Sequence, residues 1–271
     1  MKRFVAVIVI LFLYIGMLSI ALETAEVLPE KQSVPTIKKF LETAIEPIGS
    51  TMYIWGGGWN ETDTAAGSGA LRIGVSPKWK RFADKQTSSY DYRDYRYKIE
   101  HGLDCSGYVG WTIYNTVKNP APKGYVANAS NQAIYLAKQG FGMYRSRNEV
   151  MDYCAGDIMS SECTCCGHVW IVIGECVDGS VVLVHSSPPG VRICGTVNPE
   201  GDVNSQAVNL AKQYMKQYYP DWYHRYSSCA VDSAYLSHYG QMRWRLDENI
   251  MSDPEGLCDM KAKKILKIIL K

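Results

Sequence analysis

The sequence predicts an α+β fold in which one helix packs against an antiparallel sheet. Residues 108–117 carry apolar side chains at helical spacing, behind two residues, Asp104 and Ser106, that can each cap a helix start. Residues 168–174 and 181–184 are rich in β-branched side chains and flank a turn sequence, Asp178-Gly179, so they are expected to form neighbouring antiparallel strands.

Other segments extend this fold. Residues 35–48, 131–138, 204–218 and 261–271 have helical patterns, and strands between residues 157 and 185 are expected to build the sheet. A chain of 271 residues with 46% hydrophobic side chains can bury the core of a single elaborated domain.

The charge pattern excludes one class of partner. The formal net charge is +2, which gives no electrostatic argument for nucleic-acid binding. We find no phosphate-binding loop of the Walker type and no dinucleotide-binding fingerprint after a strand.

The N-terminus predicts export. Lys2-Arg3 precedes an unbroken apolar run from Phe4 to Leu22, so residues 1–25 are interpreted as a signal peptide, with an uncleaved signal anchor as the alternative. The protein is therefore expected to be secreted, or associated with the cell wall or membrane.

The remaining chain divides into two expected parts. Residues 30–250 form one domain, which carries an insertion at about 59–101, and residues 251–271 form a basic amphipathic tail. We expect this tail to pack as a terminal helix. The alternative is a surface that contacts anionic lipid or a wall polymer.

Cys105 is the strongest candidate for a reactive group. It lies in the string Asp-Cys-Ser-Gly at the expected helix start, where the partial positive charge of the helix and a neighbouring imidazolium would favour a thiolate. His168 begins the first strand and His185 ends the second. Both histidines fall on one face of the sheet for either register of the turn.

Structural interpretations compete with catalysis. A single cysteine is most often a small buried hydrophobe or half of a disulfide, and a single histidine beside a strand is most often structural. The order of Cys105 at a helix start, His168 at the beginning of a strand and His185 at the end of the next strand favours catalysis. These residues would be a thiol nucleophile, a base and an orienting residue.

The sequence resembles the NlpC family of papain-like bacterial cell-wall cysteine peptidases. The similarity covers roughly residues 36–190. Its matching blocks are Gly49-Ser50-Thr51-Met52-Tyr53-Ile54-Trp55-Gly56-Gly57, Asp104-Cys105-Ser106-Gly107, Ala155-Gly156-Asp157-Ile158, Gly167-His168-Val169 and the strand ending at His185.

The resemblance implies a papain-like fold and a role for each matching residue. Cys105 would be the nucleophile, His168 the general base and acid, and His185 the orienting residue. The implied substrate-binding residues are Tyr53, Trp55, Asp104, Ser106 and Ser130. For Tyr53 and Trp55 the alternative is ordinary aromatic packing, and for Asp104 and Ser106 it is helix capping, which is compatible with binding.

The chain departs from the family in the insertion at about 59–101, which is rich in tyrosine, arginine and lysine. It joins the Tyr53 block to the nucleophile, so it is expected to lie over or beside the groove and influence substrate choice. The alternative is a surface excursion packed by its own tyrosines.

The eight cysteines other than Cys105 predict disulfides in an exported chain, with no pairing deducible. A metal cluster at Cys163, Cys165 and Cys166 is the alternative, but no tetrahedral ligand spacing is present, so neither metal nor cofactor is expected.

The expected function is hydrolysis of peptide bonds in peptidoglycan stem peptides, at the γ-D-glutamyl bond to the diamino acid according to the resemblance. Two alternatives remain. One is a thiol-dependent amidase or acyltransferase acting on a non-wall substrate, and the other is a catalytically silent wall-binding module.

Overall fold

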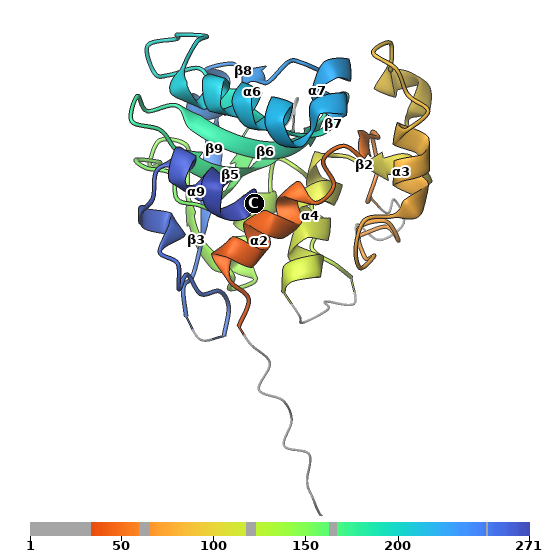
Figure 1. Ribbon diagram of the computed structural model, residues 1–271. Helices are drawn as coiled ribbons and strands as arrows, with labels where there is room; N and C mark the ends of the chain where they lie inside the picture. The colour runs from red at the N-terminus through yellow and green to blue at the C-terminus, as the bar shows by residue number, and fades with distance from the viewer. Residues whose placement is uncertain (1–33, 60–65, 118–122, 163–166, 248) are drawn as a thin grey trace, which may run out of the picture. The chain divides into compact units, whose positions relative to one another are not determined.

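The computed structural model describes residues 34–59, 66–117, 123–162, 167–247 and 249–271. These belong to one unit, Val34–Lys271, with an α+β architecture (Figure 1). The predicted export segment, residues 1–25, lies outside the described residues, as do Cys163, Cys165 and Cys166. Within the described part of the chain, no helix has the length and apolar character needed to cross a membrane.

Among the described residues, one curled sheet of nine strands organises the fold. Its order is β2-β1-β7-β6-β5-β4-β9-β3, and β8 pairs with β7. The strands are β1 (Met52–Tyr53), β2 (Gly102–Leu103), β3 (Gly142–Arg145), β4 (Ile158–Ser161), β5 (Val169–Glu175), β6 (Val181–Ser187), β7 (Gly190–Thr196), β8 (Ala230–Val231) and β9 (Tyr239–Trp244).

The sheet differs from the expected one in two respects. It is mixed, because β1 pairs with β2 and β7 pairs with β8 in parallel, while the central strands are antiparallel. It also extends beyond residues 157–185, since β7 and β9 flank the predicted strands. The two parallel pairs connect segments far apart in sequence, so no local turn pattern could indicate them.

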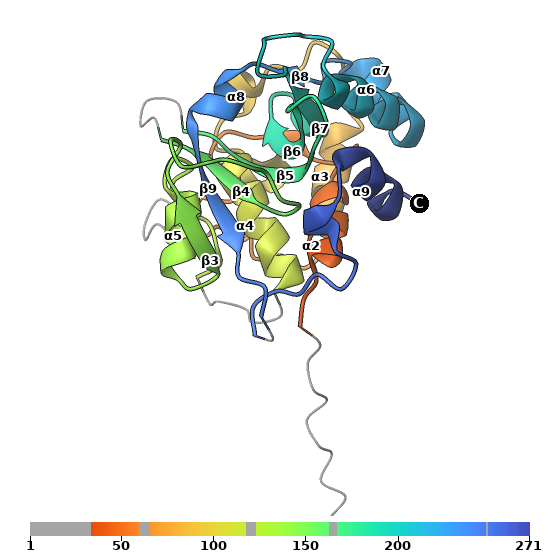
Figure 2. The same ribbon diagram turned by 90° about the vertical axis from the view of Figure 1, so that its left-hand side faces the viewer.

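Helices cover one face of the sheet (Figures 1 and 2). The α-helices of the described residues are α2 (Ile37–Ile45), α3 (Pro77–Ala83), α4 (Cys105–Thr116), α5 (Gln132–Lys138), α6 (Gln206–Tyr218), α7 (Pro220–Arg225), α8 (Ala234–Ser237) and α9 (Ala262–Ile269). The helices predicted within residues 35–48, 108–117, 131–138, 204–218 and 261–271 are therefore confirmed, with slightly different ends.

The alternation of β5 explains why residues 169–173 are all apolar. Val169, Ile171 and Ile173 pack in the main core under the helices, whereas Trp170 and Val172 pack in a second, smaller core on the other face. Because both faces of the strand are buried from Val169 to Ile173, these five side chains are all apolar, whereas Glu175 at the end of the strand is only half-buried.

The C-terminal helix α9 packs against α2, α6 and β5. Ala262, Ile265, Leu266 and Ile269 are buried in the main core, and the lysines between them are exposed. The apolar stripe of this segment is therefore used for packing within the protein.

Candidate functional site

Cys105 is the first residue of α4, and Asp104 caps the helix. The Asp104 carboxylate accepts hydrogen bonds from the Gly107 N–H at 2.7 Å and from the Ser106 hydroxyl at 3.0 Å. This arrangement satisfies one of the otherwise free backbone N–H donors of the first turn, that of Gly107, and places Cys105 at the positive end of the helix.

The glycines of the Tyr53 and Cys105 blocks allow their backbones to touch. A Cβ on Gly107 would clash with the carbonyl of Gly57, and one on Gly57 would lie 2.6 Å from the Gly102 carbonyl oxygen. The Asp104 N–H also donates to the Gly57 carbonyl at 2.9 Å. The two sequence blocks therefore meet because side chains are absent at this contact.

The two predicted histidines lie together. His168 directly precedes β5, and its Nε2 atom is 3.0 Å from Nδ1 of His185 on β6. The two histidines share a face, as expected, but not for the expected reason. Beside the turn, Glu175 pairs with Val181, a register that alone would put the histidines on opposite faces, and the bulge between Val172 and Gly174 shifts the pairing by one residue and returns them to one face.

Cys105 approaches the same strand end. Helix α4 packs against β5, Cys105 and Val169 (the residue after His168) lie in the same core, and the Val169 N–H lowers the pKa of the Cys105 thiol. Cys105 is 6% exposed, and His185 is fully enclosed.

A pocket of about 430 Å³ opens over Cys105. Six of the eight predicted site residues line it: Tyr53, Trp55, Asp104, Cys105, Ser106 and Ser130. Gly167, the residue before His168, lines the pocket as well. His168 in turn contacts His185. The structure thus brings all the predicted residues into one region.

The insertion forms part of this site. The Tyr90 hydroxyl donates to the Tyr53 carbonyl at 2.6 Å, and the Tyr92 ring meets the Tyr53 ring edge-on at 5.4 Å. The Tyr97 N–H donates to the Trp55 carbonyl at 2.8 Å, and Tyr97 lines the pocket. The insertion therefore lies beside the groove.

Sequence reasoning missed several residues of the site. Trp59, Tyr97, Asn128 and Ala129 line the pocket, and Tyr235 and Tyr239 enclose the histidines. The Tyr235 ring lies 5.7 Å from His168 and 6.0 Å from His185. Tyr235 and Tyr239 come from α8 and the start of β9, whose local sequence carries no signal of their position.

The electrostatics differ from the expected preformed thiolate. Burial, and then the charge of Asp104, raise the pKa of Cys105 to about 12, and these effects outweigh the N–H groups that lower it. Burial lowers the pKa of His168 to about 4 and that of His185 well below its usual value. At neutral pH the resting pair is therefore a thiol and a neutral imidazole.

Asp104 remains mostly ionised at neutral pH. Burial raises its pKa to about 6, although hydrogen bonds from Gly107, Ser106 and Gly56 oppose the rise. Burial also raises the pKa of Tyr53, with smaller contributions from Cys105 and Asp104. The floor of the pocket thus combines a carboxylate with neutral phenol and thiol groups.

The Ala-Gly-Asp-Ile block stabilises the contact between β4 and β9, outside the Cys105 pocket. Asp157 is buried and binds Arg243 of β9 at 2.8 Å, the Cys154 N–H at 2.8 Å and the Gln241 amide at 2.8 Å. These contacts join the start of β4 to β9. Asp157 is therefore a structural residue and does not line the pocket.

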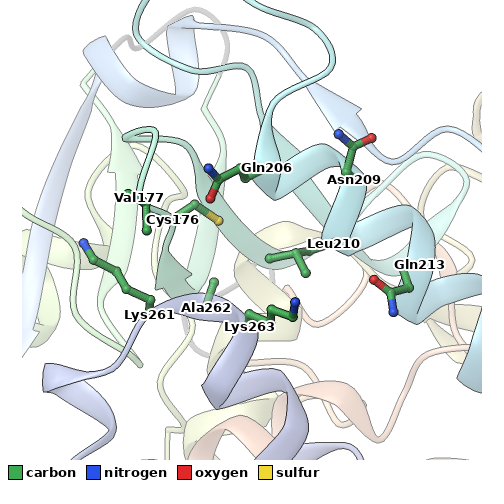
Figure 3. Close-up of a pocket in the computed structure, with 9 residues that line it drawn as sticks. All are labelled: Cys176, Val177, Gln206, Asn209, Leu210, Gln213, Lys261, Ala262 and Lys263. Atoms are coloured by element: carbon green, nitrogen blue, oxygen red, sulfur yellow. The ribbon is translucent and has the colours of Figure 1, made fainter.

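A second pocket, of about 350 Å³, lies between α6, α9 and the β5–β6 turn (Figure 3). Its lining residues are Cys176, Val177, Gln206, Asn209, Leu210, Gln213, Lys261, Ala262 and Lys263. It contains none of the predicted site residues.

The described cysteines outside the site are free thiols: Cys154, Cys176, Cys194, Cys229 and Cys258. Cys154 and Cys258 lie beside each other: the Cys154 thiol donates to the Cys258 carbonyl at 3.7 Å, and the Cys258 thiol donates to the Ala155 carbonyl at 3.8 Å. The disulfide expectation stays a prediction. Within the described ranges, no three histidine, cysteine, aspartate or glutamate side chains gather as a set of metal ligands.

Comparisons with protein-family models, with curated proteins and with solved structures found no match for this chain.

Proposed function

We propose that this protein is an exported cysteine peptidase with a papain-like fold, which hydrolyses peptide bonds in peptidoglycan stem peptides. The observation that carries the proposal is the meeting of Cys105, at the N-terminus of α4, with the strand end that bears His168 and with an open groove. The resemblance of the sequence blocks to NlpC-type peptidases supplies the substrate class, including the γ-D-glutamyl bond to the diamino acid.

The histidine pair supports a base role for His168. If the His168 Nε2–H donates to Nδ1 of His185, then Nδ1 of His168 keeps its lone pair and can accept the thiol proton. In this arrangement His185 carries its proton on Nε2, an atom that is buried and has no partner among the described residues. His185 would then orient the base without taking part in proton transfer.

The reaction would begin from the neutral pair. His168 would take the proton of Cys105 as the sulfur attacks the carbonyl carbon, and the N–H groups at the start of α4 would stabilise the oxyanion. The protonated imidazole would give its proton to the leaving amine. Water activated by His168 would then hydrolyse the thioester and release the enzyme.

The test is mass spectrometry of purified muropeptides after incubation with the mature protein. We expect cleavage products of the stem peptide, and a folded Cys105→Ala variant should lose activity by several orders of magnitude because the covalent step disappears. Cys176→Ala is the matched control, since Cys176 is a buried thiol outside the groove. Retained hydrolysis in folded Cys105→Ala protein would contradict the assignment.

The same experiment separates the alternatives. Selective labelling of Cys105 without any muropeptide product would favour an amidase or acyltransferase with another substrate. Absence of both labelling and products would favour a silent binding module.

A further inference from the structure

Arg96 of the insertion lies at the rim of the groove. Its guanidinium carbon is 5.7 Å from the centroid of the Trp55 ring and 6.0 Å from that of Tyr92. Trp55 lines the pocket and is 45% exposed. The cation therefore stacks on an aromatic wall that a ligand in the groove would contact.

Arg96 forms no ion pair with a carboxylate of the described ranges, although it is exposed. The nearby Arg93 differs, since its guanidinium binds Asp91 at 2.6 Å. Stacking on Trp55 leaves the N–H donors at the guanidinium edge able to bind an anion, and the planar group matches a carboxylate.

The backbone fixes Arg96 at this place. The next residue, Tyr97, has a φ of 60°, which is unfavourable for a residue other than glycine and persists only where the surroundings hold it. Its N–H donates to the Trp55 carbonyl, and its ring packs so closely on Gly56 that a Cβ there would lie 2.6 Å from a ring carbon. The Arg96–Tyr97 turn is thus attached to the groove wall.

We propose that Arg96, held over the Trp55 ring, binds a free carboxylate of the substrate that lies in the Cys105 groove. The inference rests on the proposed function of the Cys105 groove. In a γ-linked D-glutamyl peptide the α-carboxyl group is not used in the chain, so it supplies such a carboxylate. The protein should then prefer this peptide to the same peptide with an α-carboxamide.

Kinetics on this matched peptide pair test the proposal. We expect the parent protein to favour the carboxylate peptide in kcat/KM by about tenfold or more, which corresponds to ~1.4 kcal/mol. Arg96→Gln should lower kcat/KM for the carboxylate peptide to the level of the carboxamide and leave the carboxamide unchanged. Arg96→Lys should keep part of the preference, because it retains the charge but loses the planar stack.

Arg93→Gln is the matched control, since it removes one positive charge from the same segment at a residue already paired with Asp91. It should keep the full preference. Iodoacetamide labelling of Cys105 should be equal in all variants. Equal kcat/KM of the parent for both peptides, or a preference that survives in Arg96→Gln, would overturn the carboxylate subsite.

The two proposals fail in different ways. If the parent cleaves neither peptide, the peptidase proposal fails, and calorimetry of both peptides with Cys105→Ala protein decides the subsite. Tighter carboxylate binding that disappears when Arg96→Gln is added supports the subsite, and equal binding of the two peptides overturns it.

Discussion

Replacing Asp104 with asparagine should make Cys105 more reactive. The carboxylate accepts the Gly107 N–H at the start of α4, and an asparagine oxygen can accept the same hydrogen bond. Asp104→Asn therefore keeps the helix cap but removes a buried charge. This charge is the second cause, after burial, of the high Cys105 pKa.

The size of the effect depends on pH. The pKa of Asp104 is about 6, so the carboxylate is ionised at pH 8 and mostly protonated at pH 5. A neighbouring charge shifts a pKa by about one to three units, and one unit at Cys105 raises its thiolate fraction at pH 8 roughly tenfold. The variant should thus react with iodoacetamide about tenfold faster than the parent at pH 8, and at the same rate at pH 5.

The ionisation of Asp104 should also lower the stability of the folded parent protein as the pH rises. The folded-state pKa of Asp104, about 6, lies above its ordinary 3.8, so ionising this group costs the folded state free energy. The cost is absent below pH 3.8, grows between pH 3.8 and pH 6, and levels off at about 3 kcal/mol above pH 6. The melting temperature of Asp104→Asn relative to the parent should therefore be higher at pH 8 than at pH 4.

The assay is alkylation over a range of pH, followed by peptide mass mapping. Cys176 provides an internal reference, because burial raises its pKa to about 11 and it lies outside the groove. Both proteins should label equally when unfolded. An unchanged or slower Cys105 rate at pH 8 in folded Asp104→Asn protein, or the same rate ratio at pH 5 and pH 8, would refute the reasoning.

Two further predictions concern His185 and the thiol pair at Cys154 and Cys258. His185→Asn keeps a hydrogen-bond acceptor near the position of Nδ1, whereas His185→Leu does not. The asparagine variant should therefore retain a kcat at least about tenfold higher than the leucine variant. Equal losses of kcat in the two folded variants would argue against the orienting hydrogen bond. Oxidised glutathione should join Cys154 to Cys258 by thiol–disulfide exchange. The melting temperature should then rise, because a disulfide that closes a long loop typically adds about 2–4 kcal/mol to the free energy of unfolding. Peptide mapping without reductant checks this bond, with Cys154→Ser as the control, and failure to find the linked peptide would contradict the prediction.

Local patterns were sufficient for five of the eight α-helices and for the strands β4, β5 and β6 among the described residues, and they indicated Cys105, His168 and His185. Helical spacing located α2, α4, α5, α6 and α9, because an amphipathic helix must repeat its apolar residues with its own period. The sequence also placed His168 and His185 on one face, but this result depends on the bulge between Val172 and Gly174, which the turn at Asp178-Gly179 did not indicate. The resemblance then named the residues that the fold gathers around Cys105.

Other features depended on contacts between distant segments. Three such features join residues that share no local pattern. They are the parallel pairs β1–β2 and β7–β8, the tyrosines of α8 and β9 beside the histidines, and the position of Arg96 over Trp55. The protonation state of Cys105 also required the tertiary structure. The sequence indicated a helix start, which favours a thiolate. Burial and the Asp104 charge raise the Cys105 pKa and are the stronger effects. The sequence could not show this, because desolvation depends on all the groups that pack around the sulfur.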